Sequence, residues 1–118
     1  MANWRQLGAI WQLRPAEPTG LIEFIGGSYL AATPQISYRR LLEELAADGL
    51  AVHAWAYVPG FDHQRQARDA WSAFRSARRQ LEERCGTFGA PLRLGHSLGC
   101  KLRLLAPDGG RGSRALVA

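Results

Sequence analysis

The chain has 118 residues, which is the length of one domain with a modest core, so we expect a single domain over residues 1–118. Apolar residues make up 47% of the chain and charged residues 21%, which excludes a disordered or collagen-like protein. The longest uncharged apolar stretches have only the length of a buried strand, so no membrane span is expected, and residues 1–5 show no apolar signal segment.

The formal net charge of +5 raises the question of an anionic partner. The densest arginines fall within residues 63–85, where acidic residues follow them at the four-residue spacing of a solvated helix face, as Glu82 follows Arg78. No groove-binding or base-stacking motif accompanies this charge, so we expect no nucleic-acid partner. Docking of this helix on an anionic partner stays open as a lesser alternative.

The first elements in chain order are two strands and a helix. Residues 4–13 mix apolar and polar positions and predict one strand or a hairpin at a sheet edge. Residues 21–25 form a nearly continuous apolar run of the buried-strand type. Thr33 and Pro34 predict the start of a helix that Gly49 ends. The apolar stripe of this helix is expected to consist of Ile36, Leu41, Leu42 and Leu45.

The second part of the chain repeats this alternation. Residues 50–57 predict another strand, and Asp62 can cap the long helix that follows. Residues 91–94 predict a short strand, residues 98–105 a helix, and residues 116–118 the start of a further strand. The apolar face of the long helix is expected to consist of Ala67, Ala70, Trp71, Phe74, Ala77, Leu81 and Cys85.

Strands that alternate with helices predict an α/β fold, a three-layer sandwich with a mostly parallel sheet covered on both faces. In such a sheet, ligands bind outside the carboxyl ends of the strands. We therefore expect three loops to meet at that edge, formed by residues 26–29, 58–63 and 95–99.

The pentapeptide Gly95-His96-Ser97-Leu98-Gly99 fits the G-x-S-x-G nucleophile elbow, in which a sharp turn between a strand and a helix exposes a reactive serine. Ser97 is therefore the candidate catalytic nucleophile. The alternative is that Ser97 merely caps the following helix. A cap does not require glycine at both Gly95 and Gly99, which favours the nucleophile.

A glycine-rich segment follows the first buried strand, where a hydrolase of this architecture places part of its oxyanion hole. That hole needs two backbone N–H groups that converge on one point, and we assign them to Leu98 and Ser28. Gly26, Gly27 and Tyr29 are expected to line the substrate site. The alternative is an ordinary turn between a strand and a helix.

The histidines do not complete a catalytic triad. His53 falls within a strand, and His96 lies inside the elbow, where it must point away from Ser97. His63 alone falls at the ligand edge and is a candidate substrate-binding residue, although capping or loop packing explains it as well. In this architecture the base follows the nucleophile along the chain, but no histidine follows Ser97, and Asp108 is the only acid that does.

Neither a cofactor nor a metal ion is expected. Residues 26–31 lack the third glycine of a dinucleotide fingerprint, and residues 95–101 do not have Walker A spacing. Cys85 and Cys100 match neither a metal-binding spacing nor a secreted disulfide framework. They indicate reduced thiols in a cytoplasmic protein.

Four segments occur here in a specific combination: residues 24–27, 32–38, 61–63 and 95–101. Together they resemble an uncharacterised α/β-hydrolase-like family of cyanobacteria and plastids, a domain of unknown function. The resemblance runs from about Trp4 to the last residue. It implies that the chain is the amino-terminal half of one such domain, truncated after the helix of the elbow, with any catalytic acid and histidine beyond Ala118.

The leading interpretation is a serine hydrolase that transfers the acyl group of a small ester or thioester substrate. This chain would carry the nucleophile and the oxyanion hole but not the base, so we expect the chain alone to be inactive. The alternative is a non-catalytic binding or interaction protein on the same scaffold. The sequence leaves the oligomeric state open.

Overall fold

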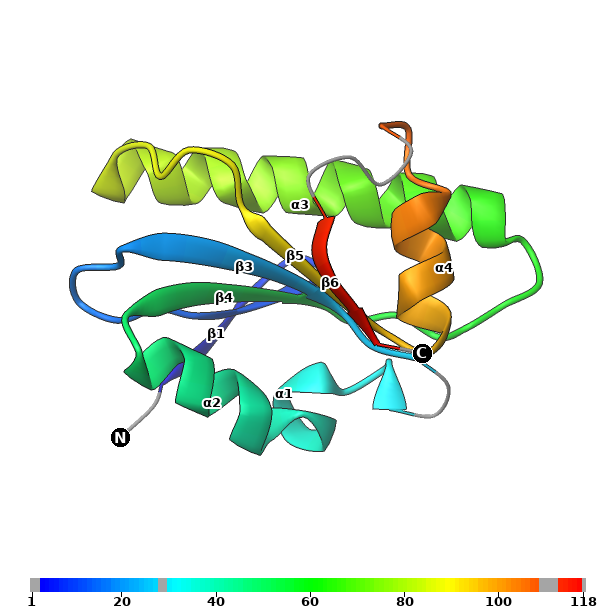
Figure 1. Cartoon of the computed structure of the whole chain (residues 1–118), viewed down its shortest axis with the longest axis horizontal. Coiled ribbons are helices and arrows are strands. Elements are labelled where there is room, and N and C mark those ends of the chain that lie inside the picture. Colours follow the sequence, from blue (N-terminus) through cyan, green and yellow to red (C-terminus); the bar gives the residue numbers. More distant parts are fainter. Residues whose placement is uncertain (1–2, 28–29, 109–112, 118) are drawn as a thin grey trace.

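The computed structural model describes residues 3–27, 30–108 and 113–117, and it places six strands in one mixed sheet with helices on both faces (Figure 1). The strands are β1 (Trp4–Leu7), β2 (Ile10–Leu13), β3 (Gly20–Ile25), β4 (Leu50–Trp55), β5 (Leu92–His96) and β6 (Ser113–Val117). The helices are α1 (Pro34–Ser37), α2 (Arg39–Ala47), α3 (His63–Cys85) and α4 (Leu98–Leu104). The predicted three-layer α/β class is confirmed.

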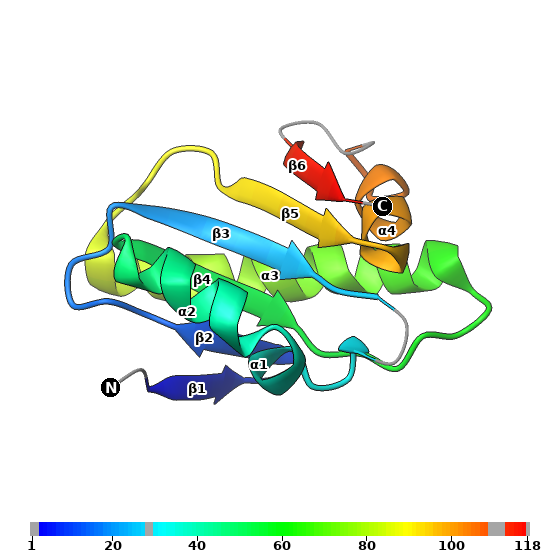
Figure 2. The ribbon, with the colours of Figure 1, turned by 60° about the horizontal axis from the view of Figure 1, so that its bottom comes forward.

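The strand order is β1-β2-β4-β3-β5-β6. The pairs β3–β4, β3–β5 and β5–β6 are parallel, whereas β1–β2 and β2–β4 are antiparallel. Figure 2 shows β1 at one edge of the sheet and β6 at the other. The amino-terminal segment is thus a hairpin, which settles the alternative that the sequence left open.

The two faces of the sheet carry separate apolar cores, because successive side chains of a strand point to opposite faces. Ile25 of β3 packs with Phe74 of α3 and Leu102 of α4. Its neighbour Phe24 packs with Leu42 of α2 on the other face. None of the helices in the described residues combines the length and the hydropathy that crossing a bilayer requires.

Helix α3 begins and ends as the sequence predicts. The Asp62 carboxylate accepts a hydrogen bond from the Arg65 N–H at 3.0 Å, and Gly86 follows the last turn with φ 81°. The residues that α3 buries are Ala67, Ala70, Phe74, Ala77 and Leu81. Trp71, which was predicted to lie on this face, is only half-buried, and its ring lies 4.5 Å from the Arg75 guanidinium.

The prediction of a single helix between residues 33 and 49 is wrong. The chain leaves the helical conformation at Tyr38 (φ −113°, ψ 17°), so α1 and α2 are separate and do not share one apolar stripe. Leu42 is fully buried, but Ile36 and Leu41 are 68% and 44% exposed. Thr33 precedes Pro34 as predicted, yet its side chain makes no capping hydrogen bond.

Candidate functional site at the carboxyl edge of the sheet

Ser97 lies in the turn that joins β5 to α4, at the carboxyl edge of the sheet. Its backbone has φ 57° and ψ −122°, and it is the only non-glycine residue with positive φ in the described part of the chain. Its side chain is exposed and makes no capping hydrogen bond to α4, which argues against a purely capping role. Non-glycine residues in this conformation cost about 1–3 kcal/mol and cluster at functional sites.

The two glycines of the pentapeptide are required by close backbone packing. A Cβ on Gly99 would lie 2.7 Å from the carbonyl carbon of Ile25, in the last residue of β3. A Cβ on Gly95 would lie 3.0 Å from the Cys100 nitrogen, in the first turn of α4. Helix α4 can therefore sit this close to β3 and β5 only because both positions lack a side chain.

The segment that follows β3 passes directly against the start of α4. A Cβ on Gly27 would lie 2.7 Å from the Leu98 nitrogen and 2.8 Å from the Ser97 Cβ. Leu98 is the first residue of α4, so its N–H has no acceptor within the helix. Ser28 and Tyr29 lie outside the described residues, so Gly26 and Gly27 are what the structure shows of this loop.

Two tyrosines hold this glycine segment in place. The Tyr57 hydroxyl donates a hydrogen bond to the Gly26 carbonyl at 2.6 Å, and burial, with a smaller contribution from Tyr38, raises the pKa of Tyr57, so it stays a neutral donor. The Tyr38 hydroxyl accepts a hydrogen bond from the Gly27 N–H at 3.2 Å. It also forms a hydrogen bond with His96 Nδ1 at 2.8 Å.

Sequence reasoning missed both tyrosines, since no spacing along the chain relates them to the glycines. A Cβ on Gly26 would overlap the Tyr38 ring and lie 2.9 Å from its hydroxyl oxygen, so the glycine pair makes room for this ring as well as for the turn. The one available signal in the sequence is the pair of adjacent glycines, Gly26 and Gly27. It indicates that another part of the chain packs closer to this backbone than a side chain would allow.

The three histidines occupy unrelated environments. His63 is half-buried at the start of α3, and within the described residues no hydrogen bond joins its ring to Ser97. His96 points toward Tyr38, away from the nucleophile position. His53 lies inside β4, where burial lowers its pKa to about 4 and its Nε2 accepts a hydrogen bond from the Gln12 amide at 2.9 Å. No cluster of metal-ligating side chains occurs in the part of the chain that the structure describes.

A family model described as a protein of unknown function, DUF1350, matches residues 3–116 of this chain. The chain belongs to the DUF1350 family. No functionally curated protein matches its sequence.

Solved structures show which fold this DUF1350 chain has. It is similar to esterase B from Lactobacillus rhamnosis, solved with a tributyrin phosphonate inhibitor, with a TM-score of 0.67 and 20% identity over 86% of the chain and 38% of the esterase. It is also similar to a carboxylesterase from Mesorhizobium loti, with a TM-score of 0.56 and 16% identity over 98% of the chain and 74% of that enzyme. The DUF1350 chain therefore has an α/β-hydrolase fold and spans less than half the length of esterase B.

Proposed function

We propose that this chain carries the nucleophile and the oxyanion hole of a serine hydrolase that acts on small ester or thioester substrates. The observation that supports this most directly is the strained backbone of the exposed Ser97, next to which the glycine segment packs on the Leu98 nitrogen. The similarity of the fold to that of two esterases agrees with an acyl substrate. In this proposal the turn at Ser97 is a nucleophile elbow.

In the proposed mechanism, Ser97 Oγ attacks the acyl carbonyl carbon and the carbonyl oxygen becomes an oxyanion. The Leu98 N–H is one of its two donors. The Gly27 N–H is already bound to the Tyr38 hydroxyl, so we assign the second donor to Ser28. Gly26, Gly27, Tyr29 and His63 are the candidate substrate-binding residues.

The base that activates Ser97 must come from outside these 118 residues in this proposal. A serine hydroxyl is a weak nucleophile without an adjacent base, and within the described residues no hydrogen bond joins a histidine ring to Ser97. We propose that a histidine oriented by an acid is contributed by chain that this sequence does not include. The free thiols of Cys85 and Cys100 support a cytoplasmic location.

The experiment is labelling with a fluorophosphonate, which forms a covalent bond with an activated serine. The 118-residue chain and a longer DUF1350 protein that contains it are compared, each beside Ser97→Ala. Ser76→Ala, at an exposed position of α3, is the matched control. We expect the longer protein to be labelled at least a hundredfold faster than the short chain, on the order of the loss seen when a triad member is missing.

Two outcomes would contradict the proposal. If the longer protein shows no labelling that depends on Ser97 but still binds acyl ligands, the non-catalytic binding protein is the better interpretation. If the short chain is labelled as fast as the longer protein, the base lies within these residues, and His63 is the first residue to test.

A further inference from the structure

A basic groove runs along α3 at the amino-terminal end of β5, away from the turn at Ser97. We call it the arginine groove. It encloses about 410 Å³, within the range of small-molecule sites. We propose that the arginine groove binds a small oxyanion with more than one negative charge, such as a phosphate ester or a polycarboxylate. The residues of the groove that carry this proposal are Trp71, Arg75, Arg78, Arg79, Arg93 and Asp108.

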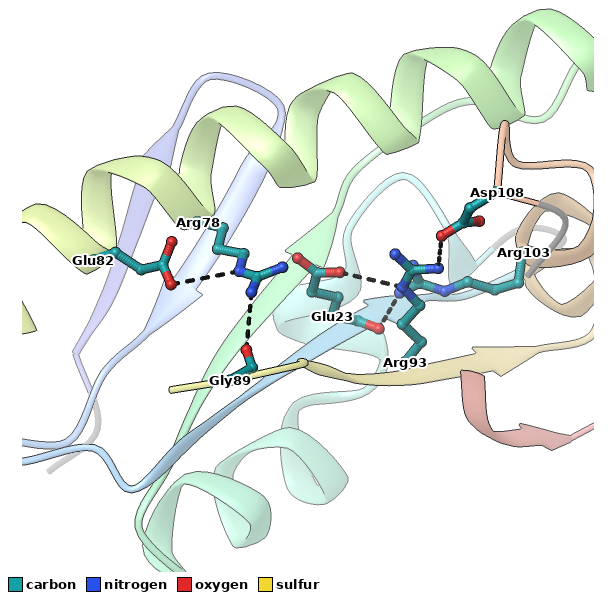
Figure 3. Close-up of polar contacts among 7 residues, drawn as sticks. All are labelled: Glu23, Arg78, Glu82, Gly89, Arg93, Arg103 and Asp108. Carbon is teal, nitrogen blue, oxygen red and sulfur yellow. Dashed lines mark hydrogen bonds and ion pairs between the residues drawn. The ribbon is translucent and has the colours of Figure 1, made fainter. Parts of the chain in front are cut away.

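Two of these arginines are held in fixed positions by the surrounding structure (Figure 3). The Arg93 guanidinium donates a hydrogen bond to Asp108, and its Nε lies 3.8 Å from Glu23 Oε1. The Arg78 guanidinium donates to the Gly89 carbonyl at 2.8 Å. Guanidinium groups that are already oriented lose little conformational entropy when an anion binds.

A buried arginine lies behind the groove. Arg103 is 5% exposed and lines a narrow inner pocket of about 30 Å³ that shares Trp71, Arg75, Arg78 and Arg93 with the groove. Its Nη2 donates to the Glu23 carbonyl and its guanidinium lies 4.7 Å from the Phe74 ring. Its Nε has no hydrogen-bond partner within the described residues. A buried N–H donor without an acceptor lowers the stability of the fold. The charge of Arg103 adds to the positive potential of the groove.

Positive charge exceeds negative charge around the groove. Five arginines line the groove and its inner pocket, against three carboxylates, those of Glu23, Glu82 and Asp108. Burial raises the pKa of Glu23, whereas Arg103 and Arg93 act to lower it. The excess of positive charge attracts an anion into the groove.

Arg75 and Arg79 are the arginines that are available to a ligand. Both are exposed, and neither has a carboxylate partner in the part of the chain that the structure describes. The Arg75 guanidinium stacks on the half-buried Trp71 ring. A ligand held by Arg75 therefore lies beside an indole whose fluorescence can report its binding.

The groove fits a small anion better than a nucleic acid. It is concave, and the carboxylates of Glu82 and Asp108 lie within its lining, where they would repel a continuous phosphate backbone. Asp69 is an exposed residue of α3 that pairs with Arg65. It places a further negative charge among the arginines of this helix. A compact ligand can contact Arg75 and Arg79, which have no carboxylate partner within the described residues.

The test is titration of the 118-residue chain with pyrophosphate and, separately, with citrate, by calorimetry at constant ionic strength. We expect saturable binding that the double variant Arg75→Gln/Arg79→Gln weakens at least tenfold. The matched control is Arg39→Gln/Arg40→Gln, which removes the same charge from exposed positions of α2 on the other face of the sheet. It should change the affinity less than twofold. Tighter binding of pyrophosphate assigns the groove to phosphates, and tighter binding of citrate assigns it to carboxylates.

Tryptophan fluorescence provides a second readout that does not depend on the stability of the arginine variants. The ligand should change the fluorescence of the natural chain, and Trp71→Phe should abolish this change. The proposal is overturned if neither anion saturates, if both double variants weaken binding equally, or if duplex DNA binds through Arg75 and Arg79 more tightly than either small anion. None of these outcomes depends on whether Ser97 is catalytic.

Discussion

Strand β5, five residues long, begins in a cluster of charged side chains and ends in a turn bounded by two glycines that pack against backbone. At its start, Arg93 reaches Glu23 and Asp108 with a long, flexible side chain. At its end, Gly95 and Gly99 bring backbone against backbone. Ion pairs therefore fix the start of β5. Its end is fixed by close backbone packing, which is possible because glycine has no side chain. The two ends should respond differently to substitution, and three predictions test this.

The largest effect is expected at the glycine end, for Gly99→Ala. The added methyl group would lie 2.7 Å from the Ile25 carbonyl carbon, and neither β3 nor α4 can move away without losing its packing. We expect a loss of about 3 kcal/mol or more in the free energy of unfolding, measured by urea denaturation. The control is Gly60→Ala, where the nearest atom is 3.7 Å away in the Gln66 side chain, and where the loss should stay below about 0.5 kcal/mol. Equal losses in the two variants would contradict this account of the glycine end.

At the charged end, we expect Arg93→Met to cost about 3 kcal/mol at pH 7, because it removes one of the cations that face the buried Glu23 carboxylate, the one whose Nε lies 3.8 Å from it. The pKa of Glu23 is already raised by burial and should rise further without Arg93. A raised pKa in the folded state means that stability is lost as the pH rises through that value. The cost of Arg93→Met should therefore be smaller at pH 5 than at pH 7.

Urea denaturation at both pH values checks this prediction. Adding Glu23→Gln to Arg93→Met should reduce the difference between pH 5 and pH 7, since Glu23 then no longer titrates and only Asp108 remains of the two carboxylates that Arg93 contacts. If the cost of Arg93→Met is the same at both pH values, charge does not set the position of this end of β5.

The smallest effect is expected at Ser97 and has the opposite sign. Glycine adopts positive φ without strain, so Ser97→Gly should raise the free energy of unfolding by about 1 kcal/mol. Ser97→Ala keeps the Cβ and should leave stability unchanged within about 0.5 kcal/mol. Thermal unfolding of the two variants in parallel measures the difference. A similar gain for alanine would show that the side chain of Ser97, and not its backbone, is the source of strain.

Much of the fold follows from local patterns in the sequence. The apolar run at residues 21–25 and the Asp62 cap each depend on a few neighbouring residues, and each was predicted correctly. The prediction failed between residues 33 and 49, where the ring of Tyr38 packs against the distant His96 and Gly26 and the helix breaks. A local pattern does not reveal these contacts of Tyr38, because the residues that make them lie elsewhere in the chain.

The sequence by itself determined the alternation of strands and helices and the glycine–serine turn, because side-chain periodicity and turn chemistry act over a few residues. Only the tertiary structure decided which distant groups meet. The hydroxyl of Tyr57 reaches Gly26 across 31 residues, that of Tyr38 reaches His96 across 58, and Arg103 reaches Glu23 across 80. These contacts depend on the strand order, which inserts β3 between β4 and β5. On the parallel side of the sheet, this order follows from crossover connections, so β3, β4, β5 and β6 are separated along the chain by whole helices where they pair.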